Sequence, residues 1–285
     1  MEVRHLLWLY EQGIRNFAGV NLCGADLRGA TLIGVNLTGA NLIGADLSRA
    51  FLTKSDLSGA QMNWANMSFA KLNDAKLVET ELTKANFSGA FMVKAKLPGA
   101  KLSGANLGGA NLRGANLWGA NFCGANLQKS NLRDANLTGV NFNWANLSEA
   151  RLPGAKLYGA SLNGVNFSKA YLKGVDLGGV DLEGVNLKGA KLTDANLEGA
   201  NLVAADLSEA HLNRVNLKGA DLTGANLTKS SLEQANLTWT ILRKADMSGA
   251  DLSEARLNGV DVEDIDLRGA ILPRSPVHSL YFTAS

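Results

Sequence analysis

The chain has 285 residues, of which 46% are apolar, and it carries 28 Lys and Arg against 26 Asp and Glu. A net charge of +2 excludes a strongly basic or acidic protein, and the sequence has no apolar run of about 18 residues that would predict a membrane-spanning helix. With 31 glycines, only four prolines and 6% aromatic residues, the composition is that of a short tandem repeat.

The first predicted element is a helix at the N-terminus. Val3, Leu6, Leu7 and Tyr10 follow the i, i+3, i+4, i+7 spacing of an amphipathic helix, and Gly13 stands where such a helix would end. Because a repeat array exposes its core at both ends, we expect residues 1–14 to form a capping helix, helical over 2–12. The apolar run is too short for a secretory signal, so we expect a cytoplasmic protein.

A five-residue repeat follows, in one register from Phe17 to Leu272. Of these 52 positions 42 are Leu, and the others are Phe, Met or Val262. Two residues before each lies a small residue, mostly Ala, and two residues after each lies the position that holds 28 of the 31 glycines. A period of five fits neither a helix nor a strand, but it fits a coil that turns a corner once per repeat, with Leu and Ala inside and Gly at the corner.

The number of repeats per turn follows from the residue that precedes each Leu. At a spacing of twenty residues, the class from Asp26 to Asp266 is Asn or Asp at thirteen of thirteen positions. Another class holds Asn or Asp at only three of thirteen: Thr31, Phe51, Lys71, Phe91, Asn111, Asn131, Arg151, Tyr171, Lys191, His211, Ser231, Asp251 and Ile271. The sequence therefore predicts a four-sided coil of twenty residues per turn and about 13 coils over residues 15–274. We call the side that holds the second class the variable face.

The last predicted segment is a tail over residues 275–285, after the repeat phase is lost. Its apolar residues are Val277, Leu280, Tyr281 and Phe282. Two interpretations stay open: the tail covers the last coil of its own chain, or it joins a second copy into a homodimer through the C-terminal end.

The chain resembles the pentapeptide-repeat proteins over residues 15–272, on the consensus Ala-Asn/Asp-Leu-X-Gly. The resemblance implies an all-β solenoid, a right-handed quadrilateral β-helix. The segments Leu6–Phe17 and Gly269–Pro273 are similar to the ends of cyanobacterial members linked to control of heterocyst differentiation. This likeness implies a non-enzymatic regulator in cyanobacterial signalling.

The sequence offers no pattern for catalysis, for a metal or for a cofactor. Its three histidines, His5, His211 and His278, have no ligand-type neighbours at metal-binding spacing. The carboxylates occupy repeat positions where Asn stands elsewhere, which favours a structural role. Cys23 and Cys123 are five turns apart, about 24 Å at the strand spacing, too far for a disulfide within one chain.

The variable face is the predicted binding surface, because aromatic and arginine side chains in line are typical of recognition surfaces. We predict that it binds a protein with an acidic surface through these residues: Phe51, Phe91, Lys94, Arg113, Arg133, Arg151, Tyr171, Lys173 and His211. The alternative interpretation is drift at tolerant positions, with long side chains stacking on their equivalents one coil away.

Charge distribution bears on two further hypotheses. Between Lys84 and Lys173 eleven bases face two acids, and between Asp176 and Leu267 sixteen acids face eight bases. The acidic stretch would suit a DNA mimic that acts on a topoisomerase, as the resemblance to other family members implies, but the basic middle opposes it. The basic stretch would suit nucleic acid, but no known nucleic-acid-binding module is present.

Overall fold

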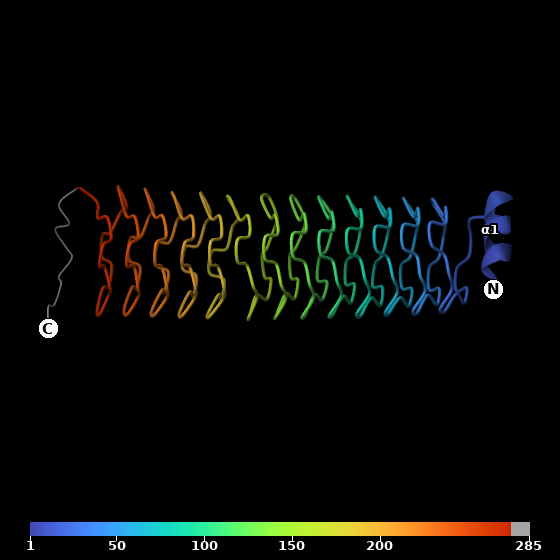
Figure 1. Ribbon diagram of the computed structural model, residues 1–285, viewed down its shortest axis with the longest axis horizontal. Helices are drawn as coiled ribbons and strands as arrows, with labels where there is room; N and C mark the ends of the chain where they lie inside the picture. The colour runs from blue at the N-terminus through green and yellow to red at the C-terminus, as the bar shows by residue number, and fades with distance from the viewer. Residues whose placement is uncertain (275–285) are drawn as a thin grey trace. The chain divides into compact units, whose positions relative to one another are not determined.

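The computed structural model describes residues 1–274 of the chain. It contains two compact units: unit 1 comprises Met1–Asn146 and Ala155–Ala160, and unit 2 comprises Leu147–Gly154 and the chain from Ser161 onward. Within each unit the chain winds into successive turns of similar shape (Figure 1). The domain boundaries predicted at residues 14 and 274 stay predictions.

The turns of each unit are joined by parallel β-bridges with a single register. Every bridge pairs residue i with residue i+20, as between Asn21 and Asn41 in unit 1 and between Asn186 and Asp206 in unit 2. The predicted turn of twenty residues is therefore confirmed. Regular structure in residues 1–274 consists of these single-residue bridges, tight turns and one helix, and this part of the chain has no extended strand.

One repeat, residues 41–45, shows how the five backbone N–H groups are satisfied. The N–H groups of Asn41, Leu42 and Gly44 donate to carbonyls of adjacent turns at 2.7–3.0 Å, and that of Ala45 donates to Leu42 O at 3.0 Å. The N–H of Ile43 has the Asn41 side chain as its acceptor, at 3.2 Å. Because an unpaired backbone donor is costly, this arrangement explains why Asn or Asp precedes the central Leu in so many repeats.

The core of each unit consists of the two inward positions of the repeat. The central residues from Leu22 to Leu252 have at most 2% of their surface exposed, and the small residues that alternate with them are buried as well, apart from a few at half-exposed sites. Because protein interiors are closely packed, a larger side chain at the small position would collide with the neighbouring Leu. The leucine and alanine periodicity thus predicts the core correctly.

The corner of each repeat has a left-handed backbone whatever its residue. All 51 corner positions from Gly19 to Gly269 have φ between 53° and 76°, and 23 of them are not glycine. Gly is therefore favoured at the corner but is not required there. A side chain in this conformation costs about 1–2 kcal/mol, so each of the 23 residues carries a local strain that the surrounding turns must offset.

Helix α1, Val3–Glu11, lies at the N-terminal end of unit 1 (Figure 1). Leu6 is its one fully buried residue. Tyr10 donates its hydroxyl to Ile33 O at 3.2 Å, and the Arg15 guanidinium lies 3.8 Å from the Tyr10 ring centroid. Gly13 ends the segment with φ 89°. The helix is one residue shorter at each end than predicted.

Toward the C-terminal end of unit 2, the central residues of the last described repeats are less buried than those before them. Leu252 is buried, whereas Val262 and Leu267 are half-buried and Leu272 is exposed. The tail that was predicted to cap this end or to join two copies, residues 275–285, lies outside the described residues.

Candidate functional site

The variable face is positioned by the bridge register. In unit 1 its column runs Thr31, Phe51, Lys71, Phe91, Asn111 and Asn131, each bridged to the next. In unit 2 the column runs from Arg151 through Tyr171, Lys191 and His211 to Ile271 in the same way. Successive side chains therefore stand about 4.8 Å apart along the column of each unit.

At Phe91 another side chain supplies the hydrogen-bond acceptor that Asn or Asp supplies in other repeats. In the turn that holds Phe91, the N–H of Val93 has no side-chain acceptor two residues before it. Asn73, one turn earlier, supplies the acceptor instead, at 3.0 Å from Val93 N. Asn63 does the same for the N–H of Thr83 at 2.9 Å. An asparagine at the outward position of one turn thus frees the next turn to carry a side chain such as that of Phe91.

In unit 1 the aromatic residues of the variable face are exposed and one is paired with a cation. Phe51 is 44% exposed and Phe91 is 38% exposed. The ammonium of Lys71 lies 3.3 Å from the Phe91 ring centroid, a cation–π contact. The ring and the charge are therefore presented together at the surface.

The cations of unit 1 differ in how far they are already neutralised. Arg113 Nε lies 3.6 Å from a carboxylate oxygen of Asp134. Lys94 and Arg133 are exposed and make no ion pair within residues 1–274. Of the predicted residues in this unit, Lys94 and Arg133 therefore offer the least compensated positive charge.

In unit 2 Tyr171 stands between two cations of the same column. Arg151 Cζ lies 5.5 Å and Lys191 Nζ 4.4 Å from the Tyr171 ring centroid, and Tyr171 is 37% exposed. The exposed ring of His211 follows in the next turn after Lys191. The structure thus brings Arg151, Tyr171 and His211 into one column, with Lys191 among them.

Lys173 belongs to a small ionic group beside that column. Its ammonium lies 3.9 Å from Asp194, and Arg214 holds the same carboxylate through two hydrogen bonds of 2.7 and 3.0 Å. The hydrogen bond from Arg214 is the main cause that lowers the pKa of Asp194. One carboxylate therefore compensates part of two positive charges, and the group keeps a net positive charge.

All nine predicted binding residues are exposed, in two sets: Phe51, Phe91, Lys94, Arg113 and Arg133 in unit 1, and Arg151, Tyr171, Lys173 and His211 in unit 2. The cation–π and ion pairs between neighbouring turns are the stacking that the alternative interpretation expected. Stacking and binding do not exclude each other, because a stacked cation still presents its charge to the solvent.

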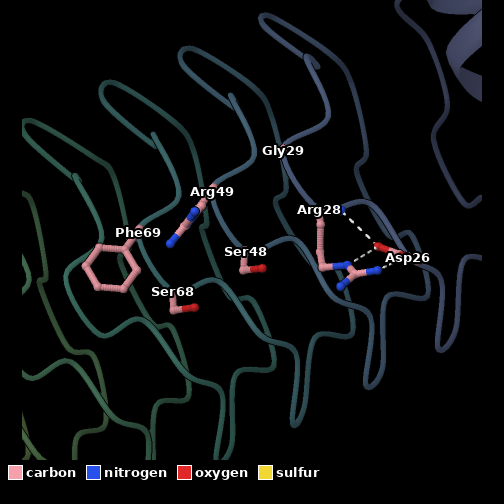
Figure 2. Close-up of a pocket in the computed structure, with 7 residues that line it drawn as sticks. All are labelled: Asp26, Arg28, Gly29, Ser48, Arg49, Ser68 and Phe69. Atoms are coloured by element: carbon pink, nitrogen blue, oxygen red, sulfur yellow. Dashed lines mark hydrogen bonds and ion pairs between the residues drawn. The ribbon is translucent and has the colours of Figure 1, made fainter.

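A shallow depression in unit 1 was missed by the sequence analysis. Figure 2 shows its lining: Asp26, Arg28, Gly29, Ser48, Arg49, Ser68 and Phe69, around a volume of about 660 Å³. Arg28 holds Asp26 through two hydrogen bonds of 2.6 and 2.8 Å, and this pairing lowers the pKa of Asp26 to about 2. Sorting the residue that follows each Leu by twenty would have placed Arg28, Ser48 and Ser68 in one column.

Several acids of unit 2 are paired within the unit. Glu198 lies 3.3 Å from Lys218, and Arg243 lies 2.7 Å from Asp261 and 3.6 Å from Glu263. The acidic stretch that suggested a DNA mimic is therefore interleaved with its own cations, which weakens its likeness to a polyanion.

Within residues 1–274, no three His, Cys, Asp or Glu side chains come together as a metal site would require. The two cysteines are both free. None of the helical structure in the same residues is long and apolar enough to cross a membrane.

Comparison with a family model gives one match. The model described as pentapeptide repeats matches in overlapping segments that run from residue 16 to residue 269. No curated protein sequence matches the chain.

Among solved structures, one is HetL, a pentapeptide repeat protein involved in heterocyst differentiation regulation from the cyanobacterium Nostoc sp. strain PCC 7120. It is 33% identical, with 98% of this chain and 100% of HetL covered and a TM-score of 0.36. A pentapeptide repeat protein of the Arabidopsis thaliana thylakoid lumen is 34% identical over 31% of this chain and 61% of its own, with a TM-score of 0.31. The fluoroquinolone resistance protein QnrB1 is 21% identical over 76% of this chain and 89% of its own, with a TM-score of 0.29. From the family match and the identity to HetL, the chain belongs to the pentapeptide repeat family, whose members fold as right-handed quadrilateral β-helices.

Proposed function

We propose that the protein is a non-enzymatic, cytoplasmic regulator that binds a protein with an acidic surface through the variable face, and that it needs no cofactor. The observation that carries the proposal is the exposure of all nine binding residues on columns fixed by the bridge register. Aromatic and arginine side chains on a rigid support are the groups that contribute most to protein–protein binding.

The pairing of rings with cations supports this role. Lys71 and Phe91 form one cation–π contact, and Lys191 and Tyr171 form another. Each pair presents an apolar ring together with a positive charge. A partner that places a carboxylate near each pair, with an apolar side chain beside it, would satisfy both components.

The biological setting is proposed from the relative. HetL is described as involved in heterocyst differentiation regulation, and the present chain is 33% identical to it over the whole of HetL. We extend to this chain a role in the control of cyanobacterial cell differentiation. The proposed partner is a protein of that control system, and nucleic acid is not the proposed partner.

The proposal is tested by reversing the charge of three arginines. Replacing Arg113, Arg133 and Arg151 with Glu changes the net charge by six and leaves the core untouched, since all three are exposed. We expect the tagged variant to lose the protein that the tagged wild type captures from the cell of origin, with an affinity at least tenfold weaker once that protein is purified. Circular dichroism and the unfolding midpoint should stay unchanged.

The matched control makes the same change in charge at exposed corners outside the binding set. Lys84, Lys229 and Lys244 replaced with Glu should capture the partner as the wild type does. Equal loss in both triple variants would mean that net charge rather than the variable face is responsible. Unchanged capture by the arginine variant would show that the partner does not bind through the variable face. If the protein shifts the mobility of random duplex DNA at moderate salt, its partner is nucleic acid instead.

A further inference from the structure

A different column of unit 1 carries two of its most exposed aromatic side chains. The column consists of Val78, Pro98, Trp118, Thr138 and Tyr158, one residue per turn, and we call it the aromatic row. Trp118 is 57% exposed and Tyr158 is 85% exposed. Since they are two turns apart, they stand about 10 Å from each other along the unit. None of these residues belongs to the variable face.

The backbone under the aromatic row is held in register. Lys96, Asn116, Asn136 and Lys156 are bridged in sequence, each to the next. The amide of Asn136 donates to the side-chain oxygen of Asn116 at 3.1 Å. The carbonyls of Trp118, Thr138 and Tyr158 accept hydrogen bonds of 2.9–3.0 Å from corner glycines one turn earlier. The spacing of the rings is thus fixed by a hydrogen-bonded scaffold.

The column on one side of the row holds a lysine one turn before Trp118 and another in the same turn as Tyr158. Lys96 and Lys156 are exposed, and neither makes an ion pair within the part of the chain that the structure describes. Lys76, in the same column, is already held by Asp56 at 3.1 Å. Lys96 and Lys156 therefore leave two uncompensated positive charges beside the aromatic row.

The other side of the row is bare backbone. The corners here are Gly99, Gly119, Gly139 and Gly159, and no side chain lies within 4 Å of the space above the last three. Glu79 is the one carboxylate of this corner column from residue 79 to residue 159, and its stem packs against Gly99 at the far end of the row. These glycine corners therefore place no side chain of their own between a bound chain and Trp118 or Tyr158.

From this arrangement we infer that the aromatic row is a second docking surface, which takes an extended acidic segment of a protein. Apolar side chains of the segment pack on Trp118 and Tyr158, and its carboxylates pair with Lys96 and Lys156. Exposed aromatic patches of this kind mark interaction sites, and the two free lysines set the sign of the partner's charge.

A single-stranded nucleic acid fits the row less well. Proteins that bind the phosphate backbone tightly neutralise many phosphates at once, and this surface offers two uncompensated cations. A protein segment can place two carboxylates about 14 Å apart, with apolar residues between them, and so match the number of these lysines and their separation of three turns.

The inference is tested with a defined probe on the full chain. The probe is the peptide (Glu-Leu)5, acetylated and amidated at its ends. Its binding is measured by ¹⁹F NMR of protein labelled with 5-fluorotryptophan, in which each of the five tryptophans gives its own signal. The Trp118 signal is assigned as the one that is missing from the spectrum of Trp118→Phe. We expect the Trp118 signal to move on titration and the Trp64 and Trp239 signals to stay. Lys96→Gln with Lys156→Gln should weaken binding at least tenfold, and so should added salt.

Three controls decide the outcome. Lys54→Gln with Lys84→Gln, which removes two cations from other columns, should leave the affinity unchanged, and the neutral peptide (Gln-Leu)5 should bind at least tenfold more weakly. A Trp118 signal that does not respond, or equal binding of both peptides, overturns the inference. Tighter binding of the oligonucleotide dT10 than of the acidic peptide also overturns it and assigns the row to nucleic acid. These variants leave the nine residues of the variable face unchanged. The experiment can therefore reject binding at the aromatic row without rejecting binding at the variable face.

Discussion

Polar side chains at the buried small position of the repeat are tolerated because they bond to the backbone. Ser55 and Ser230 donate their hydroxyls to carbonyls three residues earlier, at 2.7 Å in each case, and Thr80 and Thr240 donate to carbonyls of the preceding turn. Ser130 is the exception within residues 1–274, since its buried hydroxyl oxygen has no hydrogen-bond partner. A buried hydroxyl without a partner costs about 1–3 kcal/mol.

We therefore expect Ser130→Ala to stabilise the protein by about 1 kcal/mol, because Ala occupies most positions of this phase and removes the unpaired group. Ser230→Ala is the matched control: it lies in the same column, also follows a lysine, and loses a hydrogen bond, so it should be destabilising by a similar amount. Calorimetry of the two variants measures both effects. Destabilisation by Ser130→Ala would mean that its hydroxyl is bonded in solution.

Within the repeat, an aromatic residue at a left-handed corner restricts which residue can occupy the corner one turn later. Trp239 and Phe69 occupy corners with φ 61° and 58°, and their rings lie over Gly259 and Gly89 in the next turn. A Cβ on either glycine would overlap the ring. The glycine one turn after an aromatic corner is thus needed for space as well as for its backbone conformation.

Gly259→Ala should consequently destabilise unit 2 more than Gly219→Ala does. Both positions have a left-handed backbone, with φ 66° and 65°, but the space above Gly219 is open. The control should cost about 1–2 kcal/mol for the backbone strain alone. In a protein that already carries Trp239→Ala, the further substitution Gly259→Ala should cost only as much as Gly219→Ala does in the wild type. A double-mutant cycle of unfolding free energies measures this difference. Equal costs for the two single variants would mean that the Trp239 ring does not cover Gly259.

Much of each repeat could be predicted from the sequence, because the five-residue period assigns every position to the core, the corner or the surface. The class of Asn and Asp found at a spacing of twenty predicted the bridge register, which pairs Asp26 with Asp46. Side-chain pairing could not be predicted in this way. Arg113 and Asp134 are 21 residues apart, so they lie on adjacent turns, but only side-chain rotamers decide that they form an ion pair.

Other features were missed because only one position of the repeat was sorted by columns. Trp118 and Tyr158, which are 40 residues apart and so share a column, were therefore not considered together. The period places 23 residues other than glycine at corners, but their left-handed backbone could not be predicted from residue type, because a lysine such as Lys94 is typical of any surface. The hydrogen-bonded stack, and not the residue's own preference, imposes that conformation.

At the scale of the whole molecule, function is expected on side chains rather than on loops or cavities. The core and the backbone pairing use the inward positions and the Asn or Asp of each repeat, which leaves the outward positions of the variable face and of the aromatic row. The two parts of the variable face lie in unit 1 and unit 2, and each combines an exposed ring with a cation one turn away.

Site-specific photo-crosslinking in the cell of origin tests whether the variable face contacts the partner. A benzophenone amino acid in place of Phe91 or Tyr171 should give a covalent adduct with one and the same acidic protein. The same amino acid in place of Trp64, an exposed aromatic residue outside both surfaces, should give none. Adducts from Trp64 alone, or from none of the three positions while the wild type still captures a partner, would contradict recognition through the variable face.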